Sequence, residues 1–374
     1  MKIKAAVVQG EGQPYDIQTV ELAEPQGTDI LLRVVASGIC RSDYAERNGN
    51  SIKFPNVLGH EGAGIVEKVG SAVTSVVPGD HVILSYGYCQ ECQRCSEGHP
   101  SSCIHWLDIN NAGTNKRGEF VFEQADGTKI NNFFNQSAFA THSLVDESNI
   151  VKVDKDIDLR LLGPLGCGLG TGSGAVLDVL RPKVGQSIAI FGTGAVGFAA
   201  LMAAKVAGCG TIIALDINEE RLAKAEELGA THVINSGIDS EQVVGKIREI
   251  TNGLGADYVI DTSGVQPVMN QAMEAVANGG TFVPLAVTKQ NFEVNTFFDL
   301  VFGNKKIVGC LIGDTMPKFH LPRLIELYKE GKFPFDQFVK YYPFADINQA
   351  EADSVSGKVL KSVVVMDESY QPPS

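Results

Sequence analysis

Apolar and polar positions alternate in two different ways along the chain. From residue 187 onward, short apolar runs predict strands at 187–191, 211–215, 231–235, 256–261 and 281–285. The longer stretches between them predict helices, among them 195–207 and 219–228. Regular alternation of strand and helix is typical of a doubly wound parallel sheet. We therefore predict an α/β domain over residues 166–311.

The first 150 residues follow a different pattern, with short strand-like runs, many glycines and frequent turn signals. Runs at 30–36, 64–69 and 81–84 predict strands, so this part is predicted to be mostly β. Beyond residue 311 the pattern predicts helices at 321–329 and 347–354 and a strand at 359–365. We predict that this tail returns to the first domain, which then comprises residues 1–165 and 312–374.

The composition is that of an ordinary globular protein, with 374 residues, 44% hydrophobic and 20% charged. A chain of this length is expected to form two domains. The net charge of −13 argues against binding to nucleic acid or to anionic lipid, both of which need clustered basic residues. The first residues have no signal-peptide pattern, and no apolar run reaches the roughly 20 residues of a membrane span. We expect a cytoplasmic protein that acts on small molecules.

A glycine-rich turn follows the strand predicted at 187–191. Gly192, Gly194 and Gly197 have G-x-G-x-x-G spacing between that strand and the next helix. Such a turn lets the backbone approach a pyrophosphate at a helix N-terminus. Asp216 ends the next strand, where a carboxylate binds the ribose hydroxyls and repels a 2′-phosphate. The pattern predicts a binding site for NAD rather than NADP; the alternative is an ordinary turn beside a surface aspartate.

Four of the eight cysteines lie close together in the sequence. Cys89, Cys92, Cys95 and Cys103 have C-x2-C-x2-C-x7-C spacing. Four thiolates suit tetrahedral Zn²⁺ and leave no coordination position for a substrate. The sequence therefore predicts a structural zinc site that stabilises this loop.

A second set of metal-ligand types is spread along the chain. Cys40 lies in SGICRSD, His60 and Glu61 in LGHEGAG, and Cys167 in PLGCGLGTG. Two thiolates, one imidazole and an open position make a catalytic zinc set. The spacing does not establish that these residues meet in space, and a lone cysteine after an apolar strand is commonly just buried.

Together these motifs resemble those of the zinc-containing medium-chain alcohol dehydrogenases. GHEGAGIV, the four-cysteine loop, GCGLGTG, FGTGAVG and LDIN occur in the order of that family and cover nearly the whole chain. The segments FFNQSAFATHSLV and PLGCGLGTGSGAV resemble most the aryl-alcohol (benzyl alcohol) and geraniol dehydrogenase branch. The resemblance implies a Rossmann cofactor domain beside a mostly β, GroES-like catalytic domain.

The resemblance also implies residue roles. Cys40, His60 and Cys167 match the catalytic zinc ligands, and Asp43 matches the residue that orients the histidine. Ser42 matches the hydroxyl that takes the alcohol proton, and Glu61 a carboxylate close to the metal. The remaining matches are cofactor contacts: Thr171 near the nicotinamide, Arg41 and Lys361 at the pyrophosphate, and Arg221 near the ribose. For Arg41, Arg221 and Lys361 a solvated surface charge is the alternative.

The implied activity is hydride exchange between a small alcohol or aldehyde and NAD, with two zinc ions per chain and a homodimer or homotetramer as the assembly. One departure from the family concerns the proton relay, because Ala45 stands where many members have a histidine. An aromatic-rich insertion from residue 106 to 139 either lines a pocket for aryl substrates or packs on its own rings.

Other functions remain open from the sequence. Within the same fold they are another zinc branch (glutathione-dependent formaldehyde, polyol or short aliphatic alcohol oxidation) and a zinc-free quinone or enoyl reductase. Outside catalysis they are a zinc-ribbon binding module and an NAD-binding protein without turnover. The acidic net charge argues against the zinc ribbon as a nucleic-acid binder.

Overall fold

The computed structural model describes residues 1–49, 51–237 and 240–373. These residues form two compact units. The first comprises Met1–Cys167, Met316–Leu324 and the chain from Phe335 onward, and the second Gly168–Thr315 and Ile325–Pro334. Our sequence-based division placed all of 312–374 in the first unit. In the structure, residues 166 and 167 group with the first unit, and residues 312–315 and Ile325–Pro334 group with the second. The range Ile325–Pro334 includes the second half of the long helix α10 (Pro317–Lys329).

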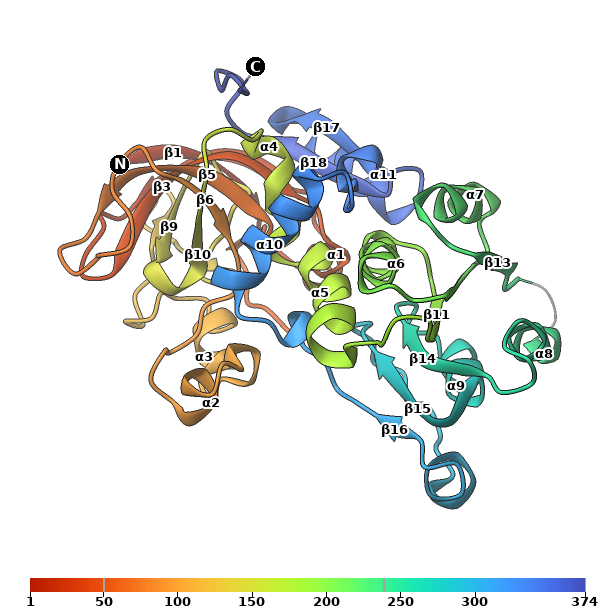
Figure 1. Ribbon diagram of the computed structural model, residues 1–374. Helices are drawn as coiled ribbons and strands as arrows, with labels where there is room; N and C mark the ends of the chain where they lie inside the picture. Colours follow the sequence, from red (N-terminus) through yellow and green to blue (C-terminus); the bar gives the residue numbers. More distant parts are fainter. Residues whose placement is uncertain (50, 238–239, 374) are drawn as a thin grey trace. The chain divides into compact units, whose positions relative to one another are not determined.

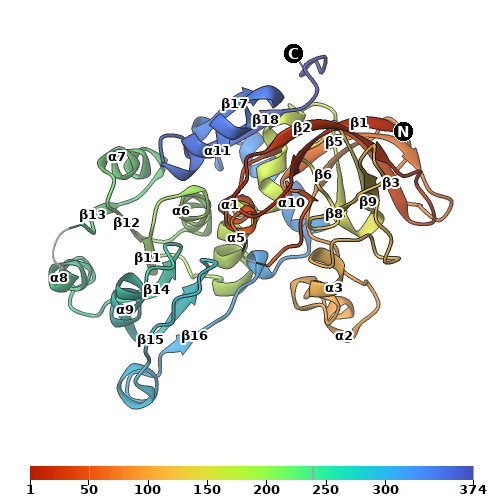
Figure 2. The ribbon, with the colours of Figure 1, turned by 180° about the vertical axis from the view of Figure 1, so that it is seen from behind.

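The first unit is built on two antiparallel-rich sheets, as the turn-rich pattern predicted (Figures 1 and 2). One is a closed barrel of β1 (Lys2–Val8), β2 (Asp16–Leu22), β7 (Phe122–Glu123), β8 (Lys129–Asn132) and β4 (Asn56–Val57). The other has the order β10 (Ile150–Val153), β6 (His81–Leu84), β5 (Gly62–Val69), β3 (Asp29–Gly38), β18 (Lys361–Val365) and β17 (Val339–Pro343), with β9 (His142–Asp146) paired to β3.

Short helices connect the strands of the first unit. They are α1 (Arg41–Arg47), α2 (Gln93–Ser96), α3 (Trp106–Asn110), α4 (Leu159–Leu162) and, near the C-terminus, α11 (Ile347–Val355). The C-terminal strand β18 pairs antiparallel with β3, where Val363 lies opposite Gly38. This pairing brings the end of the chain to the start of α1 and is the tail's return that the sequence predicted.

The second unit is the predicted doubly wound sheet. Its strands are all parallel, in the order β13 (His232–Asn235), β12 (Thr211–Asp216), β11 (Ser187–Phe191), β14 (Ala256–Asp261), β15 (Val276–Pro284) and β16 (Lys306–Ile307). The helices of the unit are α5 (Gly168–Gly174), α6 (Ala195–Ala207), α7 (Glu219–Leu228), α8 (Ser240–Ile250) and α9 (Gln266–Glu274).

Helices lie beside the sheet of the second unit (Figure 1), and buried apolar side chains hold them against it. Val243 and Ile247 of α8 and Met273 of α9 pack with Phe191 and Leu215 on one face. Such continuous apolar strands are expected when helices cover both faces of a parallel sheet. In the part of the chain that the structure describes, no helix is long and apolar enough to span a membrane.

Candidate catalytic metal centre

Four metal-ligand side chains from distant segments meet within the first unit. Single ligand atoms of Cys40, His60, Glu61 and Cys167 all lie within 4.8 Å of one another. Cys40 immediately precedes α1, His60 and Glu61 immediately precede β5, and Cys167 follows a short 3-10 turn, Gly163–Gly166. The convergence that the sequence left open is therefore present in the fold.

Close backbone contacts at glycines bring Cys167 to the other ligands. A Cβ atom on Gly163 would lie 2.0 Å from the carbonyl oxygen of Glu61, and one on Gly166 would lie 1.9 Å from that of Leu84. Only glycine allows the turn to lie this close to β5 and β6. The glycines that flank Cys167 in the sequence thus set the position of its sulfur.

Asp43 connects two of the ligand segments. Its carboxylate accepts hydrogen bonds from the backbone N–H of Cys40 at 3.0 Å and from that of Gly59 at 3.1 Å. The same carboxylate lies 3.0 Å from Nδ1 of His60. Asp43 is fully buried, so these bonds are not weakened by competition from water. With Nδ1 bonded to Asp43, Nε2 of His60 is left for a metal.

The two sulfurs of this centre lie within hydrogen-bonding distance of each other. Cys40 Sγ and Cys167 Sγ lie 4.0 Å apart. Hydrogen bonding from Cys167 holds the pKa of the Cys40 thiol well below its usual range, and the same bond with burial raises the pKa of Cys167. Burial alone would lower the pKa of His60, but the Asp43 carboxylate raises it above the usual value. Binding of a divalent cation would release the protons of the ligand groups.

Lys361 is buried beside Glu61, whereas a solvated surface charge would be exposed. Its Nζ donates to the two carboxylate oxygens of Glu61 at 3.0 and 2.8 Å and to the carbonyl oxygen of Ile39 at 3.2 Å. Burial raises the pKa of Glu61; burial alone would lower the pKa of Lys361, but Glu61 raises it. The structure therefore corrects the surface alternative for Lys361, and the partner that it gives this ammonium group is a carboxylate.

Three aromatic side chains of the insertion pack around His60; we refer to Trp106, Phe133 and Phe134 as the aromatic wall. The Phe134 ring lies 4.8 Å from the His60 ring, and the Phe133 ring packs edge-on at 5.4 Å. The Trp106 ring meets Phe134 edge-on at 5.5 Å. The rings of the insertion thus pack both on one another and against His60, while Phe139 packs on Tyr15.

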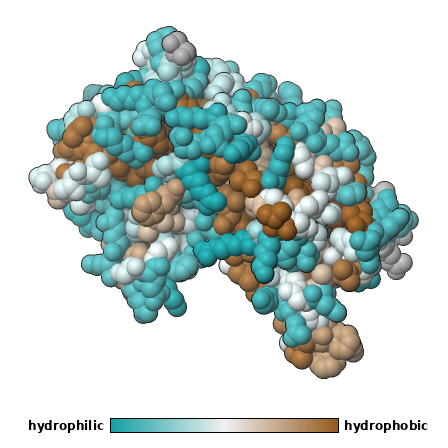
Figure 3. Space-filling model, in the orientation of Figure 1, coloured by the Kyte–Doolittle hydropathy of each residue, from teal (hydrophilic) through white to brown (hydrophobic). Residues whose placement is uncertain are grey.

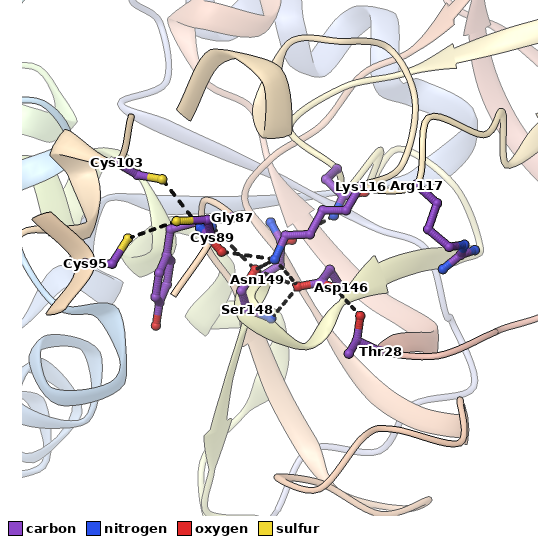
Figure 4. A network of polar contacts seen from close by, with 12 residues as sticks. Thr28, Gly87, Cys89, Cys95, Cys103, Lys116, Arg117, Asp146, Ser148 and Asn149 are labelled. Carbon is purple, nitrogen blue, oxygen red and sulfur yellow. Dashed lines mark hydrogen bonds and ion pairs between the residues drawn. The ribbon is translucent and has the colours of Figure 1, made fainter. Parts of the chain in front are cut away.

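The four cysteines of the loop form the second cluster. Their sulfurs lie within 4.8 Å of one another, with Cys89 and Cys95 separated by 3.8 Å and Cys92 and Cys95 by 3.5 Å. Backbone N–H donors lower the pKa of Cys92 to about 6, and burial raises that of Cys95 to about 12. Figure 4 shows Cys89, Cys95 and Cys103 of this cluster beside a polar network in which Lys116 bonds to Asp146, Ser148 and the Tyr88 carbonyl.

Both clusters have the dimensions that zinc requires. A tetrahedral ion with zinc–sulfur bonds of about 2.3 Å separates its sulfur ligands by about 3.8 Å. The measured separations of 4.0 Å in the first cluster and of 3.5 and 3.8 Å in the second lie close to that value. The donor sets thus fit one zinc site with room for a further ligand and one closed site.

The glycine-rich turn of the second unit has the shape of a phosphate-binding loop. Gly192 has a positive φ of 93°, and a Cβ on Gly197 would lie 1.9 Å from the Gly192 carbonyl oxygen. At Gly194 a Cβ would meet nothing within 4 Å. The first and third glycines are therefore required by the fold itself, whereas the second leaves open space at the N-terminus of α6 for a ligand.

Asp216 ends β12 as predicted, but its carboxylate is already engaged. Oδ2 accepts from the backbone N–H and the hydroxyl of Thr193, at 2.7 and 2.8 Å, and Oδ1 accepts from the N–H groups of Ile217 and Asn218. These bonds fill the four acceptor positions of a carboxylate. A ribose hydroxyl would bind here by displacing the Thr193 hydroxyl. Arg221 lies nearby, with Nη1 3.8 Å from Asp216 Oδ2.

The other predicted site residues are distributed over both units. Ser42 on α1 is half-buried, with Oγ 3.7 Å from Cys40 Sγ, which places its hydroxyl at the metal cluster. Arg41 is exposed and donates to the Val355 carbonyl. Thr171 is half-buried on α5 in the second unit. Sequence reasoning missed the Glu61–Lys361 pair; its only signal was a lysine at the start of the apolar run KSVVV.

Family models match most of both units. The model for "Alcohol dehydrogenase GroES-like domain" matches residues 26–155, and that for "Zinc-binding dehydrogenase" matches residues 195–330. Among curated proteins, geraniol dehydrogenase of Castellaniella defragrans is 38% identical over 364 residues, which cover 97% of each chain. Alcohol dehydrogenase class-P of Arabidopsis thaliana is 32% identical over 372 residues and 98% of each chain.

Two solved structures share the whole architecture. The benzyl alcohol dehydrogenase of Acinetobacter calcoaceticus is 41% identical with a TM-score of 0.94 and covers 98% of this chain and 100% of its own. An alcohol dehydrogenase zinc-binding domain protein from Burkholderia ambifaria is 43% identical, with the same TM-score and the same coverage.

Proposed function

Because this chain belongs to the zinc-binding alcohol dehydrogenase family, we propose that it interconverts a primary aryl or allylic alcohol and its aldehyde with NAD as the hydride carrier. The observation that carries the proposal is the meeting of Cys40, His60 and Cys167 beside Glu61. Zinc at such a site supplies Lewis-acid polarisation of the substrate oxygen, and NAD supplies the hydride acceptor.

The protein's own part begins with holding that site in shape. Cys40, His60 and Cys167 are the proposed ligands, and Asp43 fixes the ring of His60 through Nδ1. Glu61 is held by Lys361, so that its negative charge is balanced inside the first unit. The two thiolates and this fixed imidazole keep the donor atoms in place without reorganisation.

Ser42 is the proposed group that takes the alcohol proton. Its hydroxyl lies 3.7 Å from Cys40 Sγ, on the first turn of α1. Ala45, one turn further along the helix, has no titratable side chain, so the proton does not pass to that position. We propose that the proton leaves Ser42 for water or for another base.

Two observations support an aryl or allylic substrate. The aromatic wall packs against His60; Phe133 is buried in the core, while Phe134 and Trp106 are partly exposed. Relatives that are 38% and 41% identical over nearly the whole chain are named for geraniol, an allylic alcohol, and for benzyl alcohol. A pocket bordered by such rings should bind flat substrates better than ethanol.

NAD is the proposed cofactor, with the glycine-rich turn at its pyrophosphate. Gly194 leaves room for the ligand, and Asp216 lies at the end of the adjacent strand. Its negative charge would repel the 2′-phosphate of NADP. Arg41, Thr171 and Arg221 remain proposed contacts to the cofactor, and Lys361 keeps a phosphate role only if the ammonium group binds Glu61 and phosphate together.

The four-cysteine cluster is the proposed second zinc site, with a structural role. The loop has few apolar residues of its own. Three hydrogen bonds link its cysteines: two run from a backbone N–H group to a sulfur, and one runs between two sulfurs. A bound cation would stabilise the loop by joining all four thiolates. We therefore propose two zinc ions per chain.

A homo-oligomer is part of the proposal and has support in the second unit. Four apolar side chains on the short helix η5 (Thr296–Val301) and after it are exposed: Phe297 (54%), Phe298 (66%), Val301 (64%) and Phe302 (71%). We call them the phenylalanine patch; Figure 3 shows hydrophobic side chains gathered over this segment. An exposed patch of this kind marks an interface. A self-complementary contact with a second copy would cover it.

The proposed activity is tested by NADH absorbance during a screen of benzyl, cinnamyl, geranyl and short aliphatic alcohols, with zinc measured on the same sample. We expect two zinc ions per chain and the highest kcat/KM for an aryl or allylic alcohol. Cys167→Ser should lose one zinc and turnover by at least about 1000-fold while the fold survives; Cys209→Ser, far from both clusters in the sequence, is the control.

Each rival function gives a different result in this screen. NAD binding without any turnover would indicate a non-catalytic protein, and activity without metal would indicate a quinone or enoyl reductase. Preference for a polyol, a glutathione adduct or ethanol would assign another zinc branch. For the assembly, Phe298→Ser with Phe302→Ser should dissociate the oligomer in sedimentation experiments, and an unchanged mass would remove the phenylalanine patch as the interface.

A further inference from the structure

Asn110, the last residue of α3, is fully engaged in hydrogen bonds although it lies outside both metal clusters. Its side chain is buried, with 1% of the residue exposed. Nδ2 donates to the carbonyl oxygens of Gly87 and Trp106, both at 2.9 Å, and Oδ1 accepts from the N–H of Gly87 at 2.9 Å. The Asn110 carbonyl accepts from the N–H of Phe134 at 2.8 Å. Asn110 thus joins its own helix, which begins at Trp106, to two other segments, one at Gly87 and one at Phe134.

Two of these segments are the ends of the four-cysteine loop. Gly87 comes two residues before Cys89, which is the first ligand of the cluster. Trp106 comes three residues after Cys103, the last ligand, and its N–H donates to the Cys103 carbonyl at 3.0 Å. Asn110 therefore connects the residues just before and just after the four-cysteine loop. These residues lie next to the first and last cysteines that would bind the metal.

The third segment carries the ring that lies on His60. Two hydrogen bonds hold the backbone of Phe134. Its N–H donates to the Asn110 carbonyl, and its carbonyl accepts from Nδ2 of Asn149 at 3.2 Å. The Phe134 ring contacts His60 on one side and Trp106 on the other. Displacement of α3 would therefore move both Trp106 and Phe134 relative to the proposed catalytic ligand.

We propose that Asn110 is a positioning residue that couples the four-cysteine cluster to the aromatic wall, so that the structural metal site shapes the pocket for flat substrates. This inference rests on the proposed function for the substrate class, but the coupling itself does not require turnover. A buried amide that loses its partners leaves two carbonyls and one N–H unsatisfied, so α3 and the Phe134 segment would have to move to recover them. A shift of about 1 Å at a positioning contact is enough to change catalysis.

Trp106 is the single tryptophan of the chain, so its fluorescence reports on the aromatic wall alone. The experiment compares the zinc-loaded wild type with Asn110→Ala and Asn110→Asp; the second variant keeps the acceptor and loses the amide donor. We expect both variants to retain two zinc ions and to shift the Trp106 emission. We expect kcat/KM for benzyl alcohol to fall about tenfold, and that for ethanol by less than about twofold. Asp108→Ala, an exposed substitution on the same helix, is the matched control and should change neither signal.

A second measurement applies to the wild type and does not depend on the stability of the variants. Chelation of the four-cysteine metal should shift the Trp106 emission in step with metal release. An emission that stays constant during release would overturn the coupling, as would variants with wild-type emission and wild-type alcohol preference. A uniform loss for all alcohols together with loss of zinc would indicate a merely structural role and would also overturn it. If the wild type oxidises no alcohol, the proposed function fails, while the emission measurements still decide the coupling.

Discussion

Lys361 and Glu61, 300 positions apart in the sequence, form a buried ion pair in which Nζ lies 2.8 Å from Oε2. Both side chains are almost completely excluded from solvent, at 4% and 0% exposure. The pair joins the C-terminal strand β18 to the segment that carries His60. The position of the C-terminal strand therefore affects the geometry of the metal centre.

Lys361→Met is predicted to destabilise the first unit strongly, because the Glu61 charge would remain buried without a partner. Breaking a buried pair from one side costs about 3–5 kcal/mol in the free energy of unfolding. Urea unfolding of the zinc-loaded protein measures this change. Lys361→Arg should retain most of the stability, and the double variant Lys361→Met with Glu61→Gln should recover part of the loss. Equal stabilities of Lys361→Met and wild type would show that the pair contributes nothing.

Asp43→Asn is predicted to weaken binding of the catalytic metal while the four-cysteine site keeps its ion. The carboxylate accepts from two backbone N–H groups and from His60 at once, which an amide does less well. Loss of such a supporting partner typically reduces metal affinity by about 10–100-fold. Zinc competition with a chromogenic chelator gives the affinities of the two sites separately. The prediction fails if both sites of the variant keep wild-type affinity.

Asp216→Ala is predicted to relax the choice between NAD and NADP. Removal of the carboxylate takes away the charge that repels a 2′-phosphate, and it frees Thr193, whose hydroxyl the carboxylate holds. We expect the ratio of kcat/KM values for the two cofactors to change by about tenfold or more in favour of NADP. Steady-state kinetics with both cofactors at fixed alcohol measures the ratio. Unchanged discrimination would remove Asp216 from the ribose site.

Lys116→Met is predicted to reduce stability at neutral pH but much less in acid. Burial alone would raise the pKa of Asp146, but Lys116 with Ser148 and Thr28 lowers it below the usual value (Figure 4). A carboxyl group with a lowered folded-state pKa stabilises the protein above its unfolded pKa of about 3.9, and this contribution is lost as the pH falls through the folded pKa.

The variant should therefore be about 1–3 kcal/mol less stable than wild type at pH 7, and the difference should narrow below about pH 4. Denaturant unfolding between pH 3 and 7 measures it. Lys68→Met, which breaks an exposed pair with Glu24, serves as the control and should leave the stability almost unchanged at every pH. A difference between Lys116→Met and wild type that is the same at every pH would contradict the prediction.

Much of the second unit could be predicted from local sequence. The strands Ser187–Phe191 and Ala256–Asp261 and the helices Ala195–Ala207 and Glu219–Leu228 have the predicted bounds. The apolar sides of these elements are buried in the unit, so the apolar runs in the sequence indicate directly where the strands and helices lie. The return of the tail was expected as well, but no local signal in the sequence indicates that residues 312–315 and Ile325–Pro334 group with the second unit.

The sequence by itself determined the chemistry that this protein can carry: thiolates, imidazole and carboxylates in two groups, a glycine-rich turn, and an aspartate after the second strand of the α/β unit. Residue types and short spacings fix these, because local geometry follows from them. Only the tertiary structure decided that Cys40, His60 and Cys167 meet, that Lys361 pairs with Glu61, and that Asn110 joins the cysteine loop to Phe134. These contacts join segments far apart in the chain, and their positions depend on the packing of whole strands, which no local pattern encodes.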